Sequence, residues 1–158
     1  MILWILILIA LAMILPGFLL GWVNMRRYRV APRDGDVETT SVSICIPARN
    51  EAKNIEACIR SALASGDQAG APALEVLVYD DQSDDETPEI LARLSEEDSR
   101  VRSVPTQPLP DGWNGKQHAC ERMGHAATTE WLLFTDADVR FEPDMLRRSM
   151  LAQQRSKA

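Results

Sequence analysis

The sequence predicts an α/β fold, a mostly parallel sheet with flanking helices, preceded by one transmembrane helix. Residues 2–23 contain no charged side chain. From residue 42 onward, short apolar segments of strand length alternate with segments of helical periodicity. Strands that alternate with helices along a chain form parallel sheets with right-handed crossovers.

The opening segment has the length and composition of a membrane anchor. As a helix, residues 2–23 would span about 33 Å, which is enough to cross a bilayer. A cleaved signal peptide is the alternative, but the run is long and no basic residue precedes it. Lys and Arg concentrate on the cytoplasmic flank of a span. We therefore expect the N-terminus outside and the rest of the chain in the cytosol. The basic residues that follow the run are Arg26, Arg27 and Arg29.

The charge changes sign along the chain. We expect an anchor over 1–24, a basic juxtamembrane linker over 25–41 and a folded domain over 42–158. The net charge is -6, although residues 26–33 carry four arginines and no acid. The acidic remainder argues against general nucleic-acid binding. Three widely spaced cysteines fit reduced thiols, with neither a zinc site nor a disulfide framework.

The first half of the domain reads as strand, helix, strand, helix. Residues 42–47 are apolar and β-branched, which predicts a strand that Pro47 stops. Apolar residues at every fourth position predict a helix over about 51–64. Residues 74–79 predict the second strand. Cap-forming residues and a proline then start a helix over about 84–97.

The second half continues the alternation. Residues 101–104 predict a third, short strand, and the segment 105–115 is a loop because it is rich in proline and glycine. Residues 116–127 predict a helix. The apolar run 131–134 predicts a fourth, buried strand, and 144–157 a last helix.

Two carboxylates, Asp136 and Asp138, lie just beyond the fourth predicted strand. Side chains two residues apart at a strand end project to the same side, so both are expected to face one small site. Carboxylates held this close repel each other unless a cation lies between them. A divalent, oxygen-preferring metal that keeps positions open for phosphate oxygens would neutralise them. The alternative is a turn or a helix cap.

Further polar residues follow the other strands, and open parallel sheets bind ligands beyond the carboxyl ends of their strands. Glu51 would reach a ribose, or else only favours the first turn of a helix. Asp80 and Asp81 would accept hydrogen bonds from a base or ribose, or else cap a turn. Lys116 would pair with a phosphate, or else is solvated. Their convergence on one edge is the main functional signal.

Three side chains between these groups are harder to assign. Trp113, in the proline- and glycine-rich loop, either closes over a substrate or makes a local hydrophobic contact. His118 and His125 are expected to be solvated helix residues, and neither has a partner at metal-ligand spacing.

Four segments carry a family resemblance: Val42–Glu51 (VSICIPARNE), Glu75–Thr87 (EVLVYDDQSDDET), Gly115-Lys116 and Leu132–Val139 (LLFTDADV). They resemble the motifs of family 2 glycosyltransferases with the GT-A fold. The loop Pro108–Lys116 (PLPDGWNGK), after an N-terminal anchor, is similar to membrane glycosyltransferases associated with hopanoid and carotenoid lipids. The resemblance implies that 42–158 is the N-terminal, Rossmann-like, nucleotide-sugar-binding part of a transferase domain.

The resemblance also implies roles for individual residues. Asp136 and Asp138 would be the DxD motif that holds Mg²⁺ or Mn²⁺, with Asp138 the direct ligand. The donor would be a nucleotide-sugar, a UDP-sugar by this resemblance, and the acceptor a lipid or glycan at the membrane. The residues implied in nucleotide binding are Pro47, Glu51, Asp80, Asp81, Lys116 and Asp136.

The chain departs from the family in one respect. There, the catalytic base of an inverting displacement is a carboxylate well beyond the DxD motif. The sequence stops at Ala158 without it, so the piece is expected to be an incomplete fragment that is inactive alone.

Three other functions fit parts of the sequence. A membrane-anchored nucleotide- and metal-binding module is the main alternative. A haloacid-dehalogenase-type phosphatase is disfavoured, because Arg140 stands where that family has a Thr or Val, two residues after the second aspartate, and because three strands precede the motif. A nucleotidyltransferase is disfavoured, because residues 48–51 contain no glycine for a phosphate loop.

Overall fold

The computed structural model describes residues 2–27 and 30–157, and Tyr28 and Arg29 of the basic segment lie outside this description. The chain divides into two compact units, residues 1–31 and 32–158, and each is described by itself.

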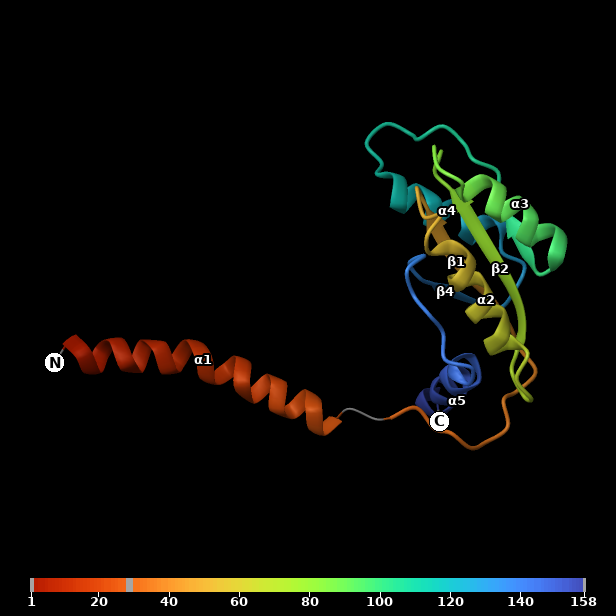
Figure 1. Ribbon diagram of the computed structural model, residues 1–158. Coiled ribbons are helices and arrows are strands. Elements are labelled where there is room, and N and C mark those ends of the chain that lie inside the picture. Colours follow the sequence, from red (N-terminus) through yellow and green to blue (C-terminus); the bar gives the residue numbers. More distant parts are fainter. Residues whose placement is uncertain (1, 28–29, 158) are drawn as a thin grey trace. The chain divides into compact units, whose positions relative to one another are not determined.

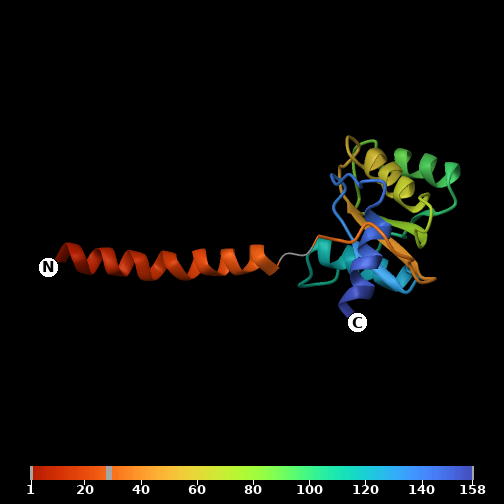
Figure 2. The same cartoon turned by 90° about the horizontal axis from the view of Figure 1, so that it is seen from below.

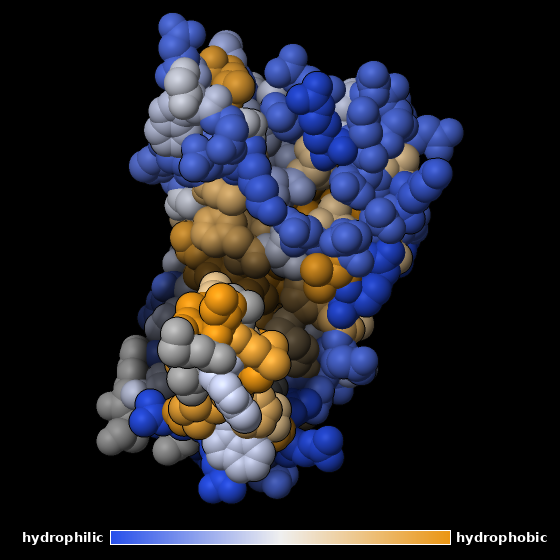
Figure 3. All heavy atoms as spheres, turned by 90° about the vertical axis from the view of Figure 1, so that its left-hand side faces the viewer, coloured by the Kyte–Doolittle hydropathy of each residue, from blue (hydrophilic) through white to orange (hydrophobic). Residues whose placement is uncertain are grey.

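The first unit consists of helix α1, Ile2–Arg27. It is long and apolar enough to cross a membrane, by length and composition. Figure 3 looks at α1 from its N-terminal end, where many of the visible side chains are hydrophobic. Near its end, Trp22 stacks on Phe18 at 6.5 Å between ring centroids, and the Arg26 guanidinium lies 4.8 Å from the Trp22 ring. The helix therefore ends in an aromatic and basic cluster.

The second unit is built on a four-stranded parallel sheet, and the predicted α/β fold is confirmed (Figure 1). The strand order is β3-β2-β1-β4, so the first strand lies inside the sheet. The strands are β1 Ser41–Ala48, β2 Ala73–Asp80, β3 Val101–Ser103 and β4 Trp131–Phe134. The helices are α2 Ile55–Gly66, α3 Thr87–Glu97, α4 Gly115–Ala126 and α5 Met145–Lys157.

The helices cover opposite faces of the sheet because side chains alternate along each strand. In β2, Val76 and Val78 pack in the cluster that contains residues of α2, α3 and α5. Leu77 and Tyr79 point to the other face and pack against α4. Figure 2 shows α2 and α3 (yellow and green) on one side of the sheet and α4 (teal) on the other.

The prediction that Pro47 stops the first strand is wrong. Pro47 lies inside β1, in register with Tyr79 of β2. The neighbouring strand β4 pairs with β1 only as far as Cys45, whose carbonyl oxygen accepts a hydrogen bond from Thr135 N at 3.1 Å. The backbone groups of alternate residues of β1 point toward β4, and those of Cys45 and Pro47 both do. The N–H that proline lacks would therefore point to the side from which β4 has already diverged. The strand therefore tolerates a proline and reaches Ala48.

An exposed ion-pair network joins α2 and α3. Glu56 and Glu97 each contact both Arg60 and Arg93, at 2.7 to 3.0 Å. Hydrogen bonds from Arg93 and Arg60 lower the pKa of Glu56 from 4.5 to about 2. Because the folded-state pKa is the lower one, the network stabilises the fold above pH 4.5 and is lost as the pH falls toward 2.

The lowered pKa of Glu56 predicts a pH-dependent effect of its replacement. Glu56→Gln is expected to lower the free energy of unfolding at pH 7 and to have little effect at pH 2. Urea denaturation of both proteins at the two pH values measures the difference. An equal difference at both values would contradict the assignment.

Candidate functional site

A cavity of about 360 Å³ lies at the carboxyl ends of β1 and β2, beside the first turn of α4. It contains five of the seven residues predicted from the sequence to form the site: Pro47, Glu51, Asp81, Lys116 and Asp136. The remaining lining residues are Ala48, Arg49, Gly115 and Ala119. The structure thus brings together side chains from four separate segments of the chain.

Asp81 follows β2 and lies against the start of α4. Its backbone N–H donates to the Ala48 carbonyl at 2.8 Å, which continues the pairing of the two strands by one residue. Its carboxylate lies 3.7 Å from the Arg49 guanidinium. A methyl group on Gly115 would come within 2.5 Å of Asp81 Oδ2. A glycine at this position therefore lets α4 begin directly beside the carboxylate.

Lys116 and Asp136 form an ion pair at the rim of the cavity. Lys116 Nζ donates to Asp136 Oδ1 at 2.6 Å, and the two side chains are 65% and 62% exposed. The bond to Asp136 raises the pKa of Lys116 above its usual value. The pair places an exposed cation in contact with one of the two carboxylates that are predicted to hold a metal.

Asp80 points away from this cavity. Its carboxylate accepts hydrogen bonds from the Ser83 N–H and hydroxyl, which is the turn-capping arrangement weighed as its alternative. It lines a different hollow, shared with Pro88 and Leu91 of the α3 segment. Asp80 and Asp81 therefore lie in different surroundings, although they are adjacent in sequence.

Asp138 is also outside the cavity lining. The exposed residues Asp136 and Asp138 flank the buried Ala137. Burial raises the pKa of the Cys58 thiol to about 11, with the Arg140 charge opposing the rise and the Asp138 and Glu51 carboxylates adding to it. Within residues 2–27 and 30–157, no three His, Cys, Asp or Glu side chains form a metal-binding group. The turn after β4 therefore offers a metal two carboxylates, those of Asp136 and Asp138. Their roles as metal ligands stay predictions.

Hydrogen bonds brace the loops that follow β1 and β2 against each other. Asn50 has a positive φ of 58°, which asparagine tolerates better than most residues. Its backbone N–H donates to Ser83 Oγ at 2.8 Å, and its side-chain oxygen accepts from Asp84 N at 2.9 Å. The Glu51 N–H donates to Thr87 Oγ1 at 2.9 Å. Sequence reasoning missed this brace, and an asparagine two residues after the end of β1 was its one local signal.

The loop between β3 and α4 is attached at the same end of the sheet (Figure 1). Gln107 N donates to Tyr79 Oη at 3.1 Å. Trp113 packs edge-on against His118 at 6.3 Å, and His118 packs likewise against Tyr79 at 5.8 Å. The prediction that His118 is solvated is wrong, because α4 turns this residue into the layer between itself and the sheet. Leu109 and Trp113 stay nearly half exposed.

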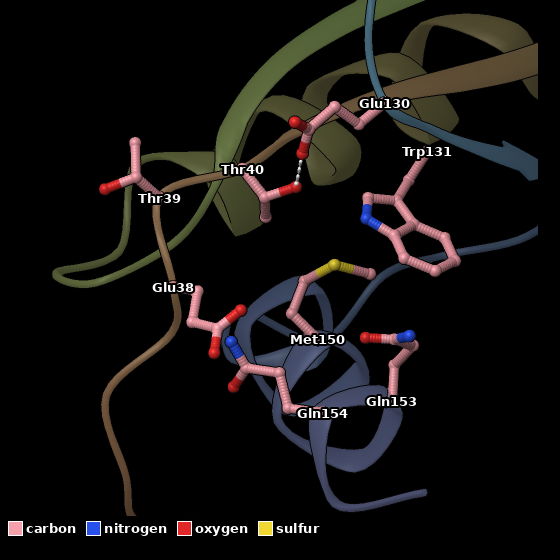
Figure 4. Close-up of a pocket in the computed structure, with 8 residues that line it drawn as sticks. All are labelled: Glu38, Thr39, Thr40, Glu130, Trp131, Met150, Gln153 and Gln154. Atoms are coloured by element: carbon pink, nitrogen blue, oxygen red, sulfur yellow. Dashed lines mark hydrogen bonds between the residues drawn. The ribbon is translucent and has the colours of Figure 1, made fainter. Parts of the chain in front are cut away.

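A second cavity, of about 380 Å³, lies between the segment that enters β1, the start of β4 and α5 (Figure 4). Thr40 Oγ1 donates to Glu130 Oε2 across it at 2.6 Å. The Trp131 ring, Met150 and Gln153 form another side. None of the predicted site residues lines this cavity. The predicted chemistry is therefore confined to the carboxyl edge.

Comparison with known proteins supports the resemblance read from the motifs. The sequence profile of Glycosyl transferase family 2 matches residues 43–157. Glycosyltransferase AglD of Haloferax volcanii is 39% identical over 99 residues, 62% of this chain and 15% of that protein. The 4,4'-diaponeurosporenoate glycosyltransferase of Staphylococcus haemolyticus is 32% identical over 117 residues, 72% of this chain and 29% of that protein. The chain thus spans less than a third of each of these relatives.

The fold has solved counterparts as well. A mannosyltransferase of Pyrobaculum calidifontis, in complex with GDP-Man and Mn²⁺, superposes with a TM-score of 0.70 at 24% identity. The match covers 92% of this chain and 42% of that one. At this identity the likeness establishes the shared fold. Because the family profile covers nearly the whole second unit, this chain belongs to Glycosyl transferase family 2.

Proposed function

We propose that this chain is the donor-binding part of a membrane-anchored inverting glycosyltransferase that moves a sugar from a nucleotide-sugar to a lipid or glycan acceptor with the help of a divalent metal. The observation that carries the proposal is the shared cavity of Asp81, Lys116 and Asp136 at the carboxyl edge of a parallel sheet. Family membership supplies the reaction class.

The cavity is suited to a nucleoside diphosphate in size and in charge. Its volume of about 360 Å³ falls in the usual range of ligand pockets, roughly 300 to 1,000 Å³. The Asp81 carboxylate accepts hydrogen bonds, as a base or ribose requires, and Lys116 and Arg49 supply cations for phosphate oxygens. Pro47 and Glu51 close the β1 side. The roles of these residues, and the choice of UDP over GDP, belong to the proposal.

The donor set after β4 fits a divalent metal. Asp136 and Asp138 supply only carboxylate oxygens, the ligands that Mg²⁺ and Mn²⁺ accept, and both are exposed. A cation held by two carboxylates has positions left for diphosphate oxygens and water. When bound, such a metal would offset the negative charge of the departing diphosphate.

The membrane and the acceptor are proposed together. Helix α1 has the length and composition of a span, and Arg26 and Arg27 at its end favour a cytoplasmic second unit. Leu109 and Trp113 expose apolar surface on a loop attached at the carboxyl edge. A relative is named for 4,4'-diaponeurosporenoate as its substrate. These features favour an apolar, lipid-like acceptor.

Binding of UDP and GDP to the whole chain in detergent, with and without Mn²⁺, tests the proposal. One of the two nucleotides is expected to bind, and Mn²⁺ is expected to increase the affinity of the protein for it. Asp136→Asn should remove most of the Mn²⁺ effect, because the amide retains the size of the side chain but loses its charge. Asp36→Asn is the matched control, since Asp36 is an exposed aspartate outside the cavity. Calorimetric titrations that detect neither nucleotide would refute the proposal.

A further inference from the structure

Lys116 and Asp136 contact each other, yet a transferase would need each for a different partner. We propose that Lys116 is the counter-ion of Asp136 in the nucleotide-free protein and leaves it for the diphosphate, so that nucleotide binding precedes and enables metal binding. The inference rests on the proposed function. Its starting observation is the 2.6 Å contact between Lys116 Nζ and Asp136 Oδ1.

The charges around the cavity show why a metal would bind weakly to the nucleotide-free protein. The Arg49 guanidinium lies 3.7 Å from the Asp81 carboxylate, and Lys116 pairs with Asp136. Each of these cations is therefore already paired with a carboxylate. A divalent ion approaching Asp136 would meet an ammonium group in hydrogen-bond contact with the same carboxylate, and like charges repel. Among the described residues, no cluster of three acidic, His or Cys side chains offsets this repulsion.

The exposure of the pair allows the exchange. Both side chains are more than 60% exposed, so packing does not fix the contact. An ion pair of this kind is weak, and the lysine stem rotates freely. Lys116 lies in the first turn of α4, on the wall of the same cavity. A diphosphate there carries more negative charge than one carboxylate, so it attracts the ammonium group more strongly.

The exchange then completes the metal site. Once Lys116 pairs with the diphosphate, Asp136 no longer has a counter-ion. Phosphate oxygens can then join the carboxylates of Asp136 and Asp138 as ligands of the metal. The nucleotide thus removes the repulsion and contributes coordination in one step. Mn²⁺ and nucleotide are therefore expected to bind cooperatively, and the cooperativity depends on Lys116.

Electron paramagnetic resonance of free Mn²⁺ measures metal binding to the whole chain in detergent. In the absence of nucleotide, Lys116→Gln is expected to bind Mn²⁺ about fivefold more tightly than the unmodified protein, the scale of an exposed ion pair. Added UDP or GDP, whichever binds, should tighten Mn²⁺ binding in the unmodified protein by a larger factor than in the variant. Lys53→Gln is the control for net charge, because Lys53 is exposed and lies outside the cavity.

The two proposals fail in different ways. Equal Mn²⁺ affinity of the unmodified protein and Lys116→Gln without nucleotide would overturn the counter-ion role, and so would equal tightening in Lys53→Gln. A protein that binds Mn²⁺ more tightly on loss of Lys116, but binds neither nucleotide, would support the counter-ion role and refute the proposed function. The metal-only titration therefore tests the inference whether or not a nucleotide binds.

Discussion

Replacing Gly115 by alanine is expected to weaken nucleotide binding about 10- to 100-fold and to leave the fold intact. The added methyl would lie 2.5 Å from Asp81 Oδ2, so the Asp81 carboxylate has to turn away from α4. The group that moves is the end of a side chain, and alanine favours helices, so folding is little affected. What is lost is the placement of Asp81. A displaced hydrogen bond to a charged group accounts for about 1.5–3 kcal/mol of binding.

The same helix offers a matched control. A methyl on Gly124 would meet the Leu132 side chain at 3.8 Å, an ordinary contact. Gly124→Ala should therefore bind nucleotide as the unmodified protein does. Calorimetric titration with the preferred nucleotide measures both variants, and circular dichroism checks their folding. Equal affinity of Gly115→Ala and Gly124→Ala would show that Asp81 does not act in binding.

Replacing Glu75 by alanine is expected to have a large effect on stability, a loss of about 2–4 kcal/mol in the free energy of unfolding. Glu75 lies in β2, and its side chain is only 13% exposed. Its carboxylate accepts from Ser43 Oγ at 2.6 Å and from Thr128 N at 2.9 Å, and Arg102 lies 3.0 Å away. One side chain thus ties β1, β3 and the segment that enters β4 to the central part of the sheet.

The effect of Glu75 should depend on pH. Burial disfavours its charged form, but hydrogen bonds from Ser43 and Thr128 and the Arg102 charge together hold its pKa below the usual value. A lowered folded-state pKa stabilises the protein above the unfolded-state pKa, and this contribution disappears as the pH falls through the folded-state value. The gap between the unmodified protein and Glu75→Ala should therefore narrow in acid.

Urea denaturation at pH 7 and at pH 3 measures this gap. Glu89→Ala is the control, because Glu89 is an exposed glutamate on α3. It should lie within about 0.5 kcal/mol of the unmodified protein. A Glu75→Ala variant as stable as Glu89→Ala at pH 7 would contradict the role of the carboxylate.

Local sequence patterns determined the elements of the second unit and the edge at which polar groups gather. The runs that became β1, β2 and β4 are apolar and end in polar residues, and a parallel sheet places those ends on one side. This pattern predicted the site at the aspartates that follow β4. These signals depend only on periodicity within a few neighbouring residues, which a sequence displays directly.

The tertiary structure alone decided which of two adjacent aspartates enters the cavity. Side chains alternate along β2, so Asp80 lies on the face of the sheet that α3 covers and Asp81 on the face that α4 covers. The choice depends on the face that α4 covers, which packing between distant segments sets. The same packing buries His118 and lets Pro47 stay in β1 where β4 has diverged. A one-dimensional pattern does not contain such long-range pairings.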